Sequence, residues 1–392
     1  MIQESRSMDF VEDITRPPLQ SHALKACRLL YVVGQLGLGG LERQLFYLLK
    51  TMDRQRYRPI VAVWDYREKD PYVQEFQRLH VPVLGLGDKP SRMEKLAAFR
   101  RMVSQFQPEV VHSYTFHTNF AAWWATLGST VLPLGSVRNS FLFDRQTTGT
   151  VLGRMCARWP HVQICNSVAA KYTAEHCATM FKAGRLCVVR NSLDLSYFSP
   201  RPFPQKITLL AVGSLYQRKR WDRLIMSLSL LSTRGIRFHV RHVGEGPLRG
   251  ELEDLAKRVG VAGLIQFLGA RNDIPELLAD SAFLVHTAED EGCPNVVMEA
   301  MACGRAVVAM DAGDIPFLVE DGKTGFVVSR GDVTRFAERV FQLLTDNDLR
   351  NRMSLAAREK AERELGLDRL ISETLAVYKS AGWKDARVGV SL

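Results

Sequence analysis

Short apolar runs alternate along this chain with longer segments in which apolar residues recur every three or four positions. The runs at residues 28–33, 58–64 and 283–285 have the length and composition of buried strands, whereas residues 92–106 have helical spacing. Strands that alternate with helices predict parallel sheets with helices on both faces. Because this rhythm continues through both halves of the chain, the pattern predicts an α/β protein.

The first predicted strand runs into a glycine-rich turn, and an apolar-periodic helix follows it. Gly39 and Gly40 stand at the predicted start of that helix, where backbone amides attract phosphate. A dinucleotide-binding fingerprint would need a further glycine where Glu42 stands, so that motif is rejected. The turn is interpreted either as a phosphate-approach element or as a tight connection between strand and helix.

The most informative stretch spans residues 286–304 and reads as a strand end, an acidic turn and a helix. Asn295 is a suitable N-cap for that helix. Glu291 lies in the loop before the helix N-terminus, and Glu299 lies further along the helix. Amides at a helix N-terminus bind anions, and carboxylates accept hydrogen bonds from hydroxyl groups, so the stretch suits a sugar nucleotide. The alternative is a solvated acidic turn before an ordinary helix.

Polar side chains also follow two predicted strands of the first half. His112, Tyr114 and His117 lie at or just after the end of the strand at residues 108–112, and Arg138 lies at the end of the next strand. Ligands of parallel sheets gather at the carboxyl ends of the strands. We therefore expect these side chains near a ligand. The alternative is that the histidines are ordinary packed or surface residues.

The length of 392 residues and the hydrophobic content of 46% predict about two domains, each with its own core. No run of about eighteen apolar residues occurs. The nearest candidate for a membrane span, residues 120–137, is interpreted as a buried helix followed by a strand. The first residues lack the pattern of a secretory signal. Seven scattered cysteines without a Cys-x-x-Cys pair indicate a reducing compartment and argue against structural zinc.

The net charge of +10 is concentrated in the first half of the chain. Residues 1–195 hold 25 Lys and Arg against 16 Asp and Glu, whereas residues 196–392 hold 27 against 26. A basic surface there indicates an anionic partner, such as phospholipid headgroups or a lipid-diphosphate acceptor. Nucleic acid is not expected, because the chain lacks an aromatic and basic stripe. The alternative is charge that serves only solubility.

Residues 291–328 resemble the signature of the retaining glycosyltransferases of family 4, the group 1 transferases with the GT-B fold. That signature has two glutamates separated by seven residues, and Glu291 and Glu299 have this spacing. The resemblance implies an α/β fold of two Rossmann-like parallel-sheet domains that face each other across a cleft. It divides the chain into an extension at 1–26, an acceptor-side domain at 27–195, a donor domain at 196–365, and a helix crossing back to the first domain, with a tail, at 366–392.

The resemblance also assigns donor-binding roles. It gives the sugar to Glu291 and to the backbone amides that follow it, and the ribose to Glu299. Relatives hold the nucleotide base at the position of Arg271. The donor-binding residues that we expect are Gly39, Gly40, Ser214, Arg218, Arg271, Gly292, Cys293, Pro294, Asn295, Val296 and Glu299.

The diphosphate is assigned to a basic cluster after the predicted strand at residues 206–212. Lys219 matches the family's lysine, whereas Ser214 stands where the family has an arginine. Arg218 or Arg220 is expected to supply the missing charge, since a guanidinium binds phosphate in a bidentate manner. The alternative is a solvated helix start.

Family members often carry two histidines separated by one residue after a strand of the first domain, and the second contacts the donor sugar. Tyr114 stands at that second position, so either His112 or His117 is expected to serve, and the choice stays open. The expected catalytic residues are Glu291, Lys219, His112 and His117. The expected acceptor-side residues are Glu42, Tyr114 and Arg138, of which Arg138 would meet an anionic acceptor.

These features predict a retaining glycosyltransferase that moves a sugar from a nucleotide sugar to a glycan or lipid-linked acceptor in glycoconjugate assembly. A UDP-sugar is favoured as the donor over a GDP-sugar. Neither a metal nor another cofactor is expected, because protein cations and amides would stabilise the leaving diphosphate. A cytoplasmic location with peripheral contact to an anionic membrane is expected. The alternatives are a GT-B epimerase of sugar nucleotides and a non-catalytic protein that binds anions or nucleic acid.

Overall fold

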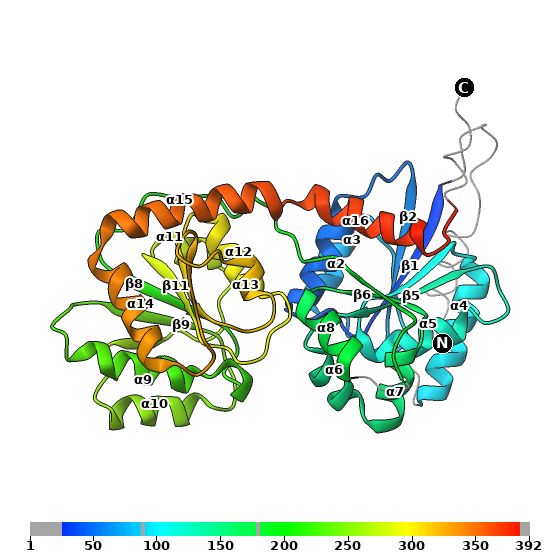
Figure 1. The fold of residues 1–392 in the computed structure, drawn as a ribbon. Helices are drawn as coiled ribbons and strands as arrows, with labels where there is room; N and C mark the ends of the chain where they lie inside the picture. The colour runs from blue at the N-terminus through cyan, green and yellow to red at the C-terminus, as the bar shows by residue number, and fades with distance from the viewer. Residues whose placement is uncertain (1–25, 88–90, 178–180, 385–392) are drawn as a thin grey trace.

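Two lobes, each built on a parallel sheet with helices packed around it, make up the molecule in Figure 1. The computed structural model describes residues 26–87, 91–177 and 181–384, so almost all of the predicted extension at 1–26 lies outside the described residues. The first sheet has the strand order β3-β2-β1-β4-β5-β6-β7. Its strands are β1 (Cys27–Val33), β2 (Tyr57–Val63), β3 (Val83–Gly85), β4 (Val110–Ser113), β5 (Leu132–Val137), β6 (Val162–Cys165) and β7 (Arg185–Val188).

The helices of the first domain connect these strands, as an all-parallel sheet requires. They are α2 (Gly40–Lys50), α3 (Pro71–Arg78), α4 (Arg92–Phe106), α5 (Asn119–Ala125), α6 (Phe141–Thr148), α7 (Thr150–Arg158) and α8 (Val168–Cys177), with a short 3₁₀ turn at Phe116–Thr118. The segment at residues 120–137 thus forms most of α5 and then β5, as the sequence predicts. No helix among the described residues is long and apolar enough to cross a membrane.

The second sheet has the strand order β10-β9-β8-β11-β12-β13. Its strands are β8 (Thr208–Val212), β9 (His239–Val243), β10 (Ile265–Phe267), β11 (Phe283–His286), β12 (Val307–Met310) and β13 (Gly325–Val328). Its helices are α9 (Trp221–Ser232), α10 (Arg249–Arg258), α11 (Ile274–Ala279), α12 (Asn295–Ala302), α13 (Ile315–Leu318), α14 (Val333–Thr345) and α15 (Asn347–Glu364), with a 3₁₀ turn at Gln217–Lys219.

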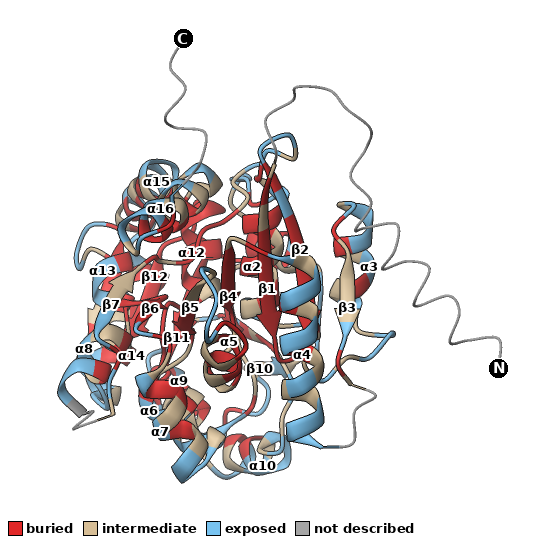
Figure 2. Ribbon diagram, turned by 90° about the vertical axis from the view of Figure 1, so that its right-hand side faces the viewer, coloured by how far each residue is buried: buried red, intermediate tan, exposed pale blue. Residues whose placement is uncertain are grey.

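Most strand residues are buried, which Figure 2 shows in red. All four residues of β11 are buried, for example, because helices cover both faces of a parallel sheet. One apolar cluster extends from Tyr31 and Leu45 in the first domain to Val297 and Met301 on α12 in the second. The two sheets confirm the predicted α/β architecture. β3 begins at Val83, because the backbone N–H of Val81 just before it donates to the carbonyl of Phe76 in α3 at 3.0 Å.

The last helix, α16 (Leu367–Ser380), belongs to the second half of the sequence but packs on the first domain (Figure 1). Tyr378 and the Nδ1 atom of His112 form a hydrogen bond of 2.7 Å, and Trp383 donates to Glu109 at 2.9 Å. Arg369 donates to the carbonyl of Asn191 at 2.6 Å. The end of the chain therefore ties the two domains together.

Candidate active site

The two domains enclose a cleft of about 940 Å³ that is lined from both sides. In the first domain its lining residues follow β1, β2, β5, β6 and β7, and in the second they follow β8, β9, β10 and β11. These positions are the carboxyl ends of parallel strands, where open α/β sheets bind their ligands. The cleft is therefore the candidate active site.

The centre of the second domain's wall is a buried ion pair. Lys219 ends the 3₁₀ turn after β8 and donates to Glu291, which lies in the loop between β11 and α12. His286, the last residue of β11, forms a hydrogen bond of 2.9 Å from its Nε2 atom to the same carboxylate. Burial by itself raises the pKa of Glu291, but the Lys219 ammonium and the His286 hydrogen bond hold it below its ordinary value. Glu291 is therefore ionised at neutral pH.

The loop after Glu291 is held tightly against both domains. A side chain on Gly292 would come within 3.0 Å of Asn166 in the first domain. Gly313 has φ +57°, and a Cβ there would lie 2.4 Å from the carbonyl oxygen of Gly292, so only glycine fits. The loop residues Gly292 to Val296 all line the cleft.

Asn295 does not cap α12, which corrects the prediction from the sequence. Its side chain faces the first domain instead and accepts hydrogen bonds from Asn191 at 2.8 Å and Gln44 at 3.5 Å. A Cβ on Gly40 would come within 2.4 Å of the Asn295 amide nitrogen, so this turn needs glycine to approach so closely. The glycine turn of the first domain and the N-terminus of α12 thus meet at one place.

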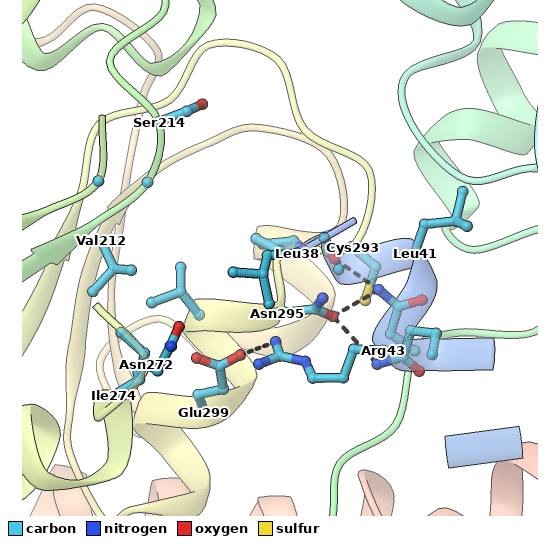
Figure 3. A pocket seen from close by; sticks show the side chains of 18 of the residues that line it. Leu38, Leu41, Arg43, Val212, Ser214, Asn272, Ile274, Cys293, Asn295 and Glu299 are labelled. Carbon is cyan, nitrogen blue, oxygen red and sulfur yellow. Dashed lines mark hydrogen bonds and ion pairs between the residues drawn. The ribbon is translucent and has the colours of Figure 1, made fainter. Parts of the chain in front are cut away.

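Glu299 forms an ion pair across the cleft with Arg43, one turn into α2 (Figure 3). Burial by itself lowers the pKa of Arg43, but the Glu299 carboxylate raises it above its ordinary value. Arg43 is not among the residues expected from the sequence. Its position three residues after Gly40, on a helix that starts at a predicted ligand-binding turn, is the signal that could have identified it.

The basic cluster after β8 divides between two environments. Arg218 lines the cleft, with its guanidinium 5.0 Å from the centroid of the Phe143 ring in the first domain. Arg220 instead donates to Asp222 and to Glu289, at 2.7 Å to the latter, and it does not line the cleft. Of the two arginines that the sequence left open, Arg218 is the one in the cleft. Ser214 and Arg271 also line it.

Arg138 lies at the end of β5 and lines the cleft, although its side chain is almost completely buried. Its guanidinium stacks 4.0 Å from the centroid of the Tyr114 ring. Tyr114 itself is fully buried behind Arg138 and is not part of the lining. Tyr114 therefore does not reach the cleft, where it was expected to contact an acceptor. It supports the Arg138 guanidinium instead.

Three further predicted residues lie behind the cleft wall. His112 is fully buried and bonded on both ring nitrogens, to Tyr378 and, at 2.9 Å, to Ser136. His117 packs against Gly34. Glu42 sits behind the glycine turn, and its burial raises its pKa to about 7. None of the three is among the described residues that line the cleft.

The described residues contain no group of three or more His, Cys, Asp or Glu side chains arranged to hold a metal ion. The cleft side chains instead form pairs between opposite charges, namely Arg43 with Glu299, Lys50 with Asp194 and Lys219 with Glu291. The site thus presents carboxylates, ammonium and guanidinium groups, and amides at a helix N-terminus. This set can bind phosphate and hydroxyl groups together.

Family models match both domains. Residues 39–191 match the glycosyl transferase 4-like domain, and residues 206–346 match the glycosyl transferases group 1. N-acetyl-alpha-D-glucosaminyl L-malate synthase of Bacillus anthracis is 32% identical over 136 residues, 35% of this chain and 36% of that protein. The putative colanic acid biosynthesis glycosyltransferase WcaL of Escherichia coli is 29% identical over 205 residues, 49% of this chain and 50% of that protein. These matches therefore span half or less of the relatives' own lengths.

The fold has close counterparts among solved structures. HepE of Anabaena, in complex with UDP and glucose, superposes with a TM-score of 0.77 at 20% identity, covering 90% of this chain and 99% of HepE. At that identity the likeness concerns the fold alone, and it confirms the predicted GT-B arrangement. With both domains matched by family models and the fold shared, the chain belongs to the group 1 glycosyl transferases.

Proposed function

We propose that this protein is a retaining glycosyltransferase that moves a sugar from a nucleotide sugar, preferably a UDP-sugar, to a glycan or lipid-linked acceptor. The observation that carries the proposal is the Lys219–Glu291 pair on one wall of a cleft whose other wall presents the Gly39–Gly40 turn. Two domains that close around such a site exclude the water that would hydrolyse the donor. The names of HepE's ligands and of WcaL's pathway support the donor class and glycoconjugate assembly.

The leaving diphosphate is the group that most needs stabilisation. Lys219 and Arg218 bring positive charge to the cleft, and the amides at Gly39 and Gly40 lie where the first domain meets α12. Preorganised donors of this kind stabilise charge as it develops on the leaving oxygen. We propose that they do so without a metal or another cofactor.

The two glutamates would orient the donor through its hydroxyl groups. Glu291 is ionised and held by two partners, so its position is well defined for a sugar hydroxyl. Glu299 would bind the ribose, and Arg43 already contacts one of its oxygens. Donor binding would therefore share Glu299 with Arg43 or displace it. In a same-face displacement, the leaving phosphate oxygen accepts the acceptor's proton, so no further protein base is required.

A screen of melting temperatures with UDP-, GDP- and ADP-glucose tests the donor class. We expect UDP-glucose to raise the melting temperature most. Product analysis by NMR then tests the reaction, with simple sugars and a lipid diphosphate as acceptors. A product that keeps the anomeric configuration of the donor supports retention, whereas an inverted product contradicts it. Isomerisation of the donor without an acceptor would indicate the epimerase instead.

We also propose peripheral contact with an anionic membrane through the first domain. Leu142 and Phe143 on α6 and Val151 on α7 are exposed apolar side chains, and Arg145 and Arg154 lie on the same two helices. α6 and α7 are in contact with each other. Apolar side chains next to basic ones suit the headgroup region of anionic lipids.

A further inference from the structure

We propose that Arg138 binds a second anionic group, a carboxylate or phosphate that is separate from the donor diphosphate. The group would belong either to the transferred sugar or to the acceptor, and this identification of the substrates depends on the function proposed above. Arg138 is only 6% exposed, and its Nε, Nη1 and Nη2 atoms are all buried without a hydrogen-bond partner.

Such a group is unusual in a folded protein, because a buried guanidinium has five N–H donors and a full charge to satisfy. No ion pair to Arg138 occurs within the described part of the chain, residues 26–87, 91–177 and 181–384. Glu291 is bonded to Lys219 and His286, and Oδ1 of Asp144 accepts from the Asn139 side chain at 2.9 Å. Oδ2 of Asp144 is buried without a partner and makes no bond to Arg138. The charge of Arg138 is therefore available to an anionic group of a bound ligand.

The guanidinium is also held in place for binding. Its stacking on Tyr114, 4.0 Å from the ring centroid, fixes its plane without using any of its N–H groups. Asn166 donates to the backbone carbonyl of Arg138 at 2.7 Å, which anchors the end of β5. A planar, fixed fork of donors is the arrangement that binds carboxylate or phosphate through two hydrogen bonds.

Arg138 belongs to the first-domain wall of the cleft, and its backbone carbonyl is bonded to Asn166. Asn166 lies against Gly292, in the loop proposed to hold the sugar, and its own Oδ1 atom is buried without a partner. The cationic residues expected near the base and diphosphate, Arg218, Lys219 and Arg271, are carried by the second domain, whereas the Gly39–Gly40 amides come from the turn after β1. Arg138 therefore faces the place where sugar and acceptor would meet. An anion there would form a charge-assisted contact in a largely dry site.

Calorimetric titration of inorganic phosphate and of malonate into the protein saturated with UDP tests the site. We expect wild-type protein to bind at least one of them, and Arg138→Gln to bind it about 10- to 100-fold more weakly. Arg138→Lys should lose part of the affinity, because a lysine offers a point charge and no fork. Arg101→Gln, an exposed arginine on α4, is the matched control and should behave as wild type. The UDP affinity of Arg138→Gln should stay within about threefold of wild type.

Three outcomes would overturn the inference: no binding of either anion by wild type, equal binding by Arg138→Gln, or a loss of more than tenfold in UDP affinity in Arg138→Gln. The last would place Arg138 at the diphosphate. Failure of wild type to bind UDP would count against the proposed function instead. The titration of phosphate and malonate without UDP would then test whether Arg138 binds an anion. The melting temperature gives a second readout. Because the variant removes an unpaired buried charge, ligand-free Arg138→Gln should melt higher than wild type, and a lower value would contradict the argument.

Paired substrates identify which one carries the anion. If the sugar does, wild type should prefer UDP-glucuronic acid to UDP-glucose, and Arg138→Gln should lose that preference. If the acceptor does, wild type should transfer faster to glucose 6-phosphate or malate than to glucose, and the variant should not. Ratios near one for both pairs in wild type would contradict the inference.

Discussion

Arg43 of the first domain and Glu299 of the second form an ion pair across the cleft, although 256 residues separate them in the chain. Glu299 is nearly buried, whereas Arg43 keeps about a quarter of its side chain exposed. The pair therefore links the two domains at the point where the donor ribose is proposed to bind. The same carboxylate thus has two candidate partners, one of them in the protein and the other in the ligand.

Replacing Arg43 with Met should separate the two roles of Glu299, its ion pair with Arg43 and its proposed binding of the ribose. The free protein should lose about 1–3 kcal/mol of stability, since the variant leaves the Glu299 carboxylate buried without its partner. Stabilisation by UDP should increase, because the ribose no longer competes with the guanidinium. Urea denaturation with and without UDP measures both effects. Arg43→Lys keeps a charge pair and is the matched control. A tenfold loss of UDP affinity in Arg43→Met would show that Arg43 binds the diphosphate instead.

Removing either member of the Lys219–Glu291 pair should lower transfer strongly. We expect Lys219→Ala and Glu291→Ala each to reduce kcat/KM by at least about 100-fold, the scale of one lost transition-state contact. Steady-state kinetics with the donor from the melting screen measures this. Lys257→Ala, which changes an exposed lysine on α10, should leave the rate unchanged. Near-normal turnover by folded Lys219→Ala would remove it from the proposed mechanism.

Glu42 should make stability depend on pH near neutrality. Burial raises its pKa from 4.5 to about 7, so the folded protein favours the protonated acid. This contribution is complete below the ordinary pKa and is lost as the pH rises through 7. Glu42→Gln should therefore gain up to about 3 kcal/mol relative to wild type between pH 5 and pH 8. Urea denaturation across that range measures the gain. A parallel pH profile for both proteins would contradict it, and Glu68→Gln, at an exposed position, is the control.

The hydrogen bond between His112 and Tyr378 should matter for stability more than for turnover. Tyr378→Phe removes the hydroxyl that joins α16 to His112 and to Tyr31, at 2.7 and 3.2 Å. We expect a loss of about 1–3 kcal/mol, the range for buried groups left without a partner. Below its melting temperature the variant should keep kcat and the donor KM within about threefold of wild type. A large rise in donor KM would instead connect His112 to the sugar.

Vesicle sedimentation tests the proposed membrane contact. Binding should require anionic lipid and weaken as salt is raised, since basic residues contribute about 1 kcal/mol each near an anionic surface. Leu142→Ser combined with Val151→Ser should reduce binding without changing transfer to a water-soluble acceptor. Leu355→Ser, at an exposed apolar position on α15, is the control. Binding that is insensitive to salt, or no binding by wild type, would contradict the contact.

The sequence by itself determined the elements and the family. Apolar runs and helical spacing are local properties, so α4 begins and ends at the predicted residues, and the 120–137 segment is correctly interpreted as helix and strand. The Glu291 and Glu299 spacing is equally local, because a loop and a single helix carry both residues. These features needed no knowledge of how the two domains pack.

Only the tertiary structure decided which polar side chains reach the cleft. His112 lies near the end of β4 and Arg138 directly follows β5 of the same sheet. His112 is nevertheless bonded to Tyr378 of α16, 266 residues later in the chain, whereas Arg138 lines the cleft. The partner of Glu299 likewise comes from the other domain. Such contacts depend on how two separately folded sheets are oriented and on where the last helix packs, and neither is encoded in the spacing of neighbouring residues.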